Sequence, residues 1–145
     1  MSKSNTFENE LLLLIFNNDT MSGVGDATGI VGSSTDGNLY FSLHTSDPGE
    51  AGDQTTNEIG YTSYARVAVA RTTGGFTVTA NAVATAADVS FPAGTGGSGT
   101  ATHFGIGTAS TSTGKLLYKG AISPSIVCGS GVTPILSAGT VVTED

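Results

Sequence analysis

Two histidines, His44 and His103, are the side chains best suited to acid–base chemistry in this 145-residue chain. A hydrolytic triad would need one of them within hydrogen-bond reach of a serine and a carboxylate. The sequence lacks the Gly-x-Ser-x-Gly motif that surrounds many nucleophilic serines. Both histidines lie in segments of alternating polarity, on the side opposite the large apolar residues. We therefore expect surface or interface histidines rather than general bases, and a protein that is not an enzyme.

The loop from Ser46 to Gly60, called the acidic loop below, carries the carboxylates that could bind a metal ion. These are Asp47, Glu50, Asp53 and Glu58. Calcium takes six or more oxygen ligands, but the fixed glycine and the terminal glutamate of the EF-hand loop are missing here. We expect a solvated acidic loop that contacts a partner protein, with calcium binding as the alternative.

Two glycine-rich segments, 23–29 and 94–99, are candidates for phosphate binding. A dinucleotide site needs a strand before the glycines and a helix after them, whereas the first segment follows a predicted helix and precedes a loop. The second segment lacks the Lys-Ser/Thr pair of a phosphate-binding loop. Cys128 is the single cysteine, so it forms no intrachain disulfide and is expected to be a buried thiol. One cysteine and two scattered histidines do not make a zinc site, and no cofactor is expected.

Five basic residues against twelve acidic ones give the chain a formal net charge of −7. Proteins recognise the phosphates of nucleic acids mainly through Lys and Arg, and anionic membrane surfaces attract the same residues. Neither nucleic acid nor a membrane is therefore an expected partner. The apolar run 11–16 is too short to span a bilayer, and no signal-peptide cleavage site follows it. We expect the protein to be made and assembled in a cytoplasm.

Composition and turn signals predict an all-β, single-domain antiparallel β-sandwich or jelly roll with a short N-terminal helix. The chain has 21 glycines and only 12% charged residues, and turn residues separate short alternating segments. The clearest strand begins at Leu39 and ends before Asp47. A strand over about 64–71 is expected to form a hairpin with one over 76–80. Further strands are expected over 83–91, 101–109, 115–122, 126–128, 133–136 and 140–143.

The sequence predicts one helix, over residues 4–17. Asn5 can cap it, and Glu8 follows at the spacing of a capping box. Its shared apolar face consists of Phe7, Leu11, Leu14 and Ile15. Because so short a helix is marginal alone in water, this face should dock on the protein's own sheet or on a neighbouring subunit. We therefore predict an N-terminal arm and helix at 1–17 and a β-sandwich at 18–145. The four helix residues and the four carboxylates of the acidic loop are the candidates for a subunit interface.

Several short motifs occur in order along the chain. They are His44-Thr-Ser-Asp-Pro48, Asn57-Glu58, Tyr64-Ala-Arg66, Val89-Ser-Phe-Pro92 and His103-Phe-Gly105. With the helix before them, they resemble a family of small tailed-bacteriophage virion proteins, commonly labelled tail fibre proteins. The resemblance covers nearly the whole chain, and it implies a non-enzymatic β-protein of the phage particle.

Small β-sandwich proteins of phage particles also act as capsid cement, often as trimers. The resemblance therefore leads us to expect a decoration protein on the outside of the head, with the major capsid protein and sister copies as its partners. A compact domain, an apolar helix and an acidic surface favour this interpretation. The alternative is a tail-fibre or tail-tip subunit, although no elongated repeat or trimerisation stem is visible. A carbohydrate- or calcium-binding module outside the virion is the third hypothesis.

Overall fold

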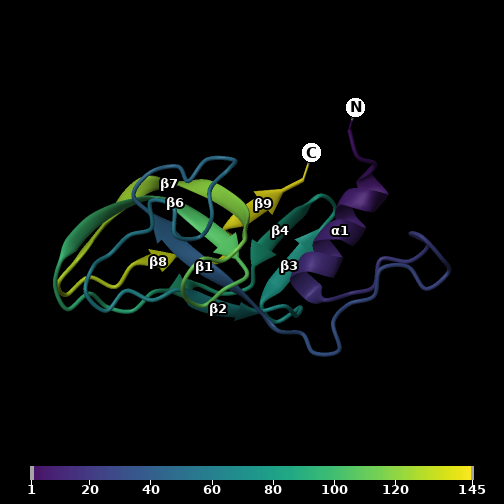
Figure 1. The fold of residues 1–145 in the computed structure, drawn as a ribbon, viewed down its shortest axis with the longest axis horizontal. Coiled ribbons are helices and arrows are strands. Elements are labelled where there is room, and N and C mark those ends of the chain that lie inside the picture. The colour runs from purple at the N-terminus through teal and green to yellow at the C-terminus, as the bar shows by residue number, and fades with distance from the viewer. Residues whose placement is uncertain (1, 145) are drawn as a thin grey trace. The chain divides into compact units, whose positions relative to one another are not determined.

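The computed structural model describes residues 2–144, which contain one helix and nine strands (Figure 1). They are α1 (Asn5–Asn17), β1 (Asn38–His44), β2 (Val67–Ala70), β3 (Phe76–Thr79), β4 (Ala82–Thr85), β5 (Val89–Ser90), β6 (Ser98–Gly107), β7 (Leu116–Gly129), β8 (Ile135–Leu136) and β9 (Val141–Thr143). The registered strand pairs are antiparallel, which confirms the predicted all-β class with a short N-terminal helix. Among the described residues, no helix is both long and apolar enough to cross a membrane.

The described residues group into two compact units. The helical unit comprises residues 2–38, 70–88 and 137–144, and the sheet unit comprises residues 39–69 and 89–136. The helix thus shares a unit with β3, β4 and β9. The division predicted from the sequence separates 1–17 from 18–145 instead, and its terminal residues Met1 and Asp145 lie outside the described part.

The core of the sheet unit lies on one face of β1 and β6. In the antiparallel register, Phe41 is opposite Ile106 and Leu43 is opposite Phe104. All four side chains are buried, and the rings of Phe41 and Phe104 stack with their centroids 6.3 Å apart. Burying each such side chain contributes roughly 1.5–3 kcal/mol to stability. This face therefore supplies much of the free energy that holds the sheet together.

Strand β7 joins two segments that the sequence predicts as separate strands, 115–122 and 126–128. It is the edge strand of a sheet with the order β2-β1-β6-β7. Its register with β6 shifts between Ala101 and His103, so residues 122–125 bulge out of the ladder around Pro124. Proline has no N–H to donate to a ladder, which explains why the sequence reads as a break although the strand continues.

The predicted hairpin between the second and third strands is wrong. Strand β3 pairs with β4, and β9 pairs with the other side of β4. The reversal lies at Ala80 and Asn81, and Ala80 adopts a positive φ of 54°, which suits a tight two-residue hairpin turn. The turn at 72–75 is a local turn, in which the N–H groups of Gly75 and Phe76 both donate to the carbonyl of Thr72. It does not join two paired strands, because β2 and β3 belong to different sheets.

The N-cap of helix α1 lies one residue before the predicted cap. Ser4 is the N-cap, with an extended backbone, and its Oγ accepts a hydrogen bond from the N–H of Phe7. Asn5 is therefore the first helical residue rather than the cap. The error is small because serine and asparagine are both favoured cap residues and lie side by side here.

The helix docks through a different stripe from the predicted one. Leu12 and Phe16 are fully buried and Glu8 is nearly so, and α1 packs on β3 and β4. The ring of Phe16 meets that of Phe76 edge to face, with centroids 4.9 Å apart. The buried residues recur at i, i+4 and i+8, a spacing as regular as that of the predicted face.

Arg71 holds the C-terminal end of α1. Its Nε donates to the carbonyl of Ile15 and its Nη2 to that of Leu14, both at 2.6 Å, while Nη1 donates to the carbonyl of Asp36 at 3.2 Å. The last carbonyls of a helix have no partners within the helix, and a cation there also interacts favourably with the helix dipole. Arg71 thus fastens the end of the helix to the segment that precedes β1 and to the turn that precedes β3.

Replacing Arg71 by alanine should destabilise the helical unit by about 2 kcal/mol, because hydrogen bonds to charged groups are each worth roughly 1.5–3 kcal/mol. Urea unfolding followed by the helical circular dichroism signal measures the change. Lys115→Ala, which removes an exposed cation, is the matched control and should shift the unfolding free energy by less than about 0.5 kcal/mol. Equal unfolding midpoints for the two variants would show that Arg71 does not fasten the helix.

Candidate functional site

Strand β1 is buried on both faces, and its polar face carries Ser42 and His44. The acidic loop folds back along the strand, so that the N–H of Ile59 donates to the carbonyl of Leu43 at 2.9 Å. The prediction that His44 lies at a surface or interface is therefore wrong, because the loop covers this face. His103, opposite His44 in the register of β1 and β6, is half-buried.

Ser42, His44 and Thr56 form a hydrogen-bonded chain on this covered face. His44 Nδ1 lies 2.8 Å from the carbonyl oxygen of Thr56, and its Nε2 lies 2.9 Å from Ser42 Oγ. A carbonyl only accepts, so Nδ1 carries the proton and, in the neutral ring, Nε2 accepts from the serine hydroxyl. Burial lowers the pKa of His44 below its ordinary value, which favours this neutral form.

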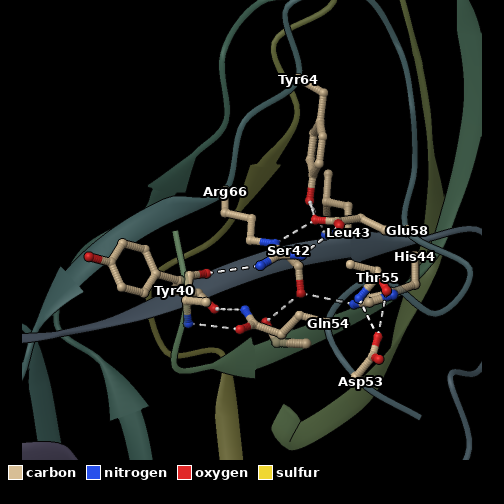
Figure 2. A network of polar contacts seen from close by, with 12 residues as sticks. Tyr40, Ser42, Leu43, His44, Asp53, Gln54, Thr55, Glu58, Tyr64 and Arg66 are labelled. Carbon is tan, nitrogen blue, oxygen red and sulfur yellow. Dashed lines mark hydrogen bonds and ion pairs between the residues drawn. The ribbon is translucent and has the colours of Figure 1, made fainter. Parts of the chain in front are cut away.

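This Ser–His pair has the spacing of a nucleophile and its base, but not their surroundings. The third position holds a backbone carbonyl in place of the carboxylate that would stabilise a charged imidazole. Both side chains are fully buried, so no substrate reaches the hydroxyl in this conformation. The pair joins the acidic loop to β1 (Figure 2).

A second polar group, formed by Glu58, Tyr64 and Arg66, fixes the end of the acidic loop. Arg66 Nε and Nη2 each donate to one carboxylate oxygen of Glu58 at 2.7 Å, and Tyr64 Oη donates to Glu58 Oε1 at 2.8 Å. The Tyr64 hydroxyl also accepts from the N–H of Leu43 at 3.0 Å. Bidentate pairing with the carboxylate raises the pKa of Arg66, and burial raises the pKa of Tyr64. A neighbouring pocket of about 190 Å³ is lined in part by Glu58, Tyr64 and Arg66. These three side chains already bond to one another, so their polar groups are not available to a ligand.

Gln54 anchors the middle of the acidic loop. Its Oε1 accepts from the N–H of Ala109 at 2.9 Å, and its Nε2 donates to the carbonyl of Tyr40 at 3.3 Å. The side chain is fully buried. A Cβ at Gly107 would lie 2.2 Å from Gln54 Cδ, and one at Gly114 would lie 2.1 Å from its Oε1. These two glycines leave the space that the amide occupies.

The four candidate calcium ligands do not converge on one point. Lys119 Nζ lies 3.0 Å from Asp47 Oδ1 and 3.1 Å from Glu50 Oε1, beside a hollow of about 260 Å³. Asp53 Oδ1 accepts from the hydroxyl and the N–H of Thr55 at 2.6 and 2.8 Å, and these bonds lower its pKa. Glu58 belongs to the arginine pair. Within residues 2–144, no group of three His, Cys, Asp or Glu side chains is placed to hold a metal ion.

One family of proteins matches this chain almost from end to end. The family described as "Podophage GP4 fiber I protein gp80" matches residues 2–144. The chain belongs to this family. No curated protein matches it. The resemblance to phage tail fibre proteins is thereby confirmed, and the chain is a structural protein of a bacteriophage virion.

In this fibre-family chain, the predicted apolar helix face is partly open. Phe7 is 40% exposed, and Leu11, Leu14 and Ile15 are half-buried. They lie beside the stripe that docks on β3 and β4 rather than within it. Their role at a subunit interface stays a prediction, as does that of the four carboxylates. Cys128 is a buried free thiol, as predicted.

Sequence reasoning missed Ser42, Gln54, Tyr64 and Arg66 as members of one polar network. The available signal was the pair Ser42 and His44, which share a face of a strand whose other face is strongly apolar. Alternation alone assigns such residues to solvent. A long loop that follows directly and ends in apolar residues indicates that the polar face can be covered.

Gly107→Ala should lower the free energy of unfolding of the sheet unit by about 1–3 kcal/mol, the usual cost of overpacking. The three atoms nearest to the added methyl all belong to Gln54, so the same substitution in a Gln54→Ala background should cost less than about 1 kcal/mol. Urea unfolding of the four proteins in this cycle measures the coupling. Gly60→Ala, where nothing lies within 4 Å, is the control. Additive costs in the cycle would contradict the assigned contact.

The sheet unit should lose stability as the pH falls below about 6.5, because His44 is buried in its neutral form. Burial lowers its pKa below the ordinary 6.5, so the unfolded chain takes up a proton at a higher pH than the folded chain. Stability that is complete above the unfolded pKa is therefore lost as the pH falls toward the folded pKa. Urea unfolding at about pH 7.5 and about pH 5.5 should show this loss in the wild type and a smaller one in His44→Gln.

Glutamine is suitable because its amide can donate to the Thr56 carbonyl and accept from the Ser42 hydroxyl. The charged groups that act on His44 are, in decreasing order of effect, Glu58, Arg66 and His103. His103→Gln, which removes the weakest of these, is the matched control. It should retain most of the pH dependence of the wild type, because burial is the largest cause of the lowered pKa of His44. If His44→Gln retains it as well, another group is responsible.

Proposed function

We propose that this chain is a non-enzymatic fibre subunit that works by adhesion, packing its folded surface against neighbouring virion proteins. The observation that carries the proposal is the family match over residues 2–144. The buried Ser–His pair supports it, since the groups best arranged for acid–base chemistry are fully covered. Protein partners fit better than nucleic acid or membrane, because the chain has a formal net charge of −7.

Adhesion of this kind needs a surface that keeps its shape. Three anchors hold the acidic loop: the Thr56 carbonyl on His44, the Gln54 amide, and the Glu58–Arg66 pair. Its outer carboxylates remain accessible, and the side chain of Glu50 is 95% exposed. A rigid contact surface binds more tightly because little conformational entropy is lost on association. The acidic loop is thus suited to contact a partner, as the sequence analysis predicts.

Decoration of the outside of the capsid is the second candidate function. It would place the chain on the major capsid protein beside sister copies, as a trimer. The half-open helix face with Phe7 at its edge favours it, because apolar area buried on a shell contributes roughly 25 cal/mol per Å² before the costs of association. The fibre role is nearer to the family's description and is therefore preferred.

Gold-labelled antibodies on intact virions should mark the tail fibres, because the family is described as a fibre protein. Electron microscopy of negatively stained particles measures the position of the label, and particles that lack the protein are the control. Label spread over the head would instead support the decoration role and refute the fibre role. Purified virions without any label or immunoblot signal would refute both.

A further inference from the structure

The segment 18–37, called the 18–37 loop here, connects α1 to β1 without a helix or strand of its own. In Figure 1 it is the dark blue coil that follows α1 and runs outward from it. Loops of this length inside compact proteins are usually either functional or disordered. Three aliphatic side chains of the loop face solvent: Val24 is 41%, Ile30 46% and Val31 59% exposed.

Hydrogen bonds hold this loop at its base, middle and tip. At the base, Asn18 Nδ2 donates to the carbonyl of Ser33 at 2.9 Å, and Ser33 N–H donates back to Asn18 Oδ1 at 2.7 Å. In the middle, Met21 and Ile30 exchange two backbone hydrogen bonds of 3.0 and 2.9 Å. At the tip, Asp26 Oδ1 accepts from two N–H groups. The loop is therefore an ordered element rather than a flexible linker.

Apolar packing contributes little to the order of this loop. Fixing the backbone costs roughly 1–2 kcal/mol per residue, and glycines at 23, 25 and 29 with positive φ add to that cost. The loop buries one large apolar side chain, Met21, worth roughly 1.5–3 kcal/mol. Exposed apolar side chains that lie together, unlike ones scattered singly, are typical of a contact surface, and Ile30 and Val31 are neighbours in the chain.

The charge of the loop defines the chemistry of its partner. Asp19, Asp26 and Asp36 are exposed along it, and the sequence has no Lys or Arg between Lys3 and Arg66. A surface that combines carboxylates with aliphatic groups is complementary to one that combines Lys or Arg with apolar area.

A second copy of this chain does not supply such a surface. In the part of the chain that the structure describes, Lys3, Arg66 and Lys119 are in ion pairs, and Arg71 binds the helix carbonyls and the carbonyl of Asp36 in the 18–37 loop. Lys115 is then the one described cation left to face another copy. Because each chain has a formal net charge of −7, two copies would also repel each other.

We propose that the 18–37 loop is a docking arm for a different virion protein, whose contact surface is apolar and surrounded by Lys and Arg. The proposal rests on the proposed function in taking the partner from the virion. The aliphatic side chains supply the contact area, and the three aspartates select a basic partner.

Incorporation into particles tests the proposal. A phage with a nonsense mutation in this gene is grown in cells that supply the wild-type or a variant chain. Quantitative immunoblotting then measures the number of copies of the chain in each particle. The double variant Val24→Ser/Val31→Ser should be incorporated at least tenfold less than the wild type. Val127→Ser, at a valine that is 68% exposed on β7, is the matched control and should be incorporated normally. Both variants should keep the wild-type melting temperature.

Asp19→Lys tests the charge of the arm and should also reduce incorporation at least tenfold. A photo-crosslinking amino acid at Val31 in the assembled virion, followed by mass spectrometry, identifies the contacted segment. It should belong to another virion protein and contain more Lys and Arg than Asp and Glu.

Normal incorporation of the double variant would overturn the docking arm and leave the fibre role intact. Absence of the wild-type chain from particles would refute the proposed function itself. Cross-links from Val31 to a second copy, or loop-dependent self-association of the purified chain in sedimentation velocity, would show that the partner is wrongly assigned.

Discussion

The sheet unit depends on the rule that polar groups cut off from water must find partners within the protein. The acidic loop covers the polar face of β1, and Ser42, His44 and Gln54 become fully buried. Each makes hydrogen bonds to the loop, the strand or the turn after β6. Among the described residues, the buried side-chain atom that lacks a partner is Thr85 Oγ1, which lies in the helical unit. The loop and the strand beneath it therefore stabilise each other.

This constraint also explains why a Ser–His pair occurs in a structural protein of the virion. A catalytic histidine must accept and release a proton during turnover, which requires access for the substrate, and in a hydrolytic triad a carboxylate stabilises the charged ring. His44 has the Thr56 carbonyl on one side and a buried hydroxyl on the other. Both bonds favour one neutral tautomer, so the ring positions the loop. The same atoms that would have indicated catalysis in an open cleft indicate rigidity here.

The all-β class, most strand positions and the helix follow from the sequence because they depend on local periodicity. The face on which each residue packs does not. The helix is apolar almost all round, so Phe7 and Leu11 compete with Leu12 and Phe16 for the docked face, and only the shape of β3 and β4 decides between them. His44 is misplaced for a similar reason, since alternation describes a strand and not the loop that folds over it. The polar network could not be predicted for the same reason, because its members come together only when the loop folds over the strand.

The carboxylates of the acidic loop and those of the 18–37 loop have different partners. In the acidic loop, Glu58 is paired with Arg66, and Asp47 and Glu50 share Lys119. In the 18–37 loop, local hydrogen bonds join Asn18 to Ser33, while Asp19 and three aliphatic side chains face solvent. A chain with five basic residues has few cations to neutralise both loops. Arg66 and Lys119 pair with the acidic loop, and Arg71 binds the helix end and the carbonyl of Asp36. With three aspartates against this one cation, the 18–37 loop keeps a net negative charge that a basic partner can neutralise.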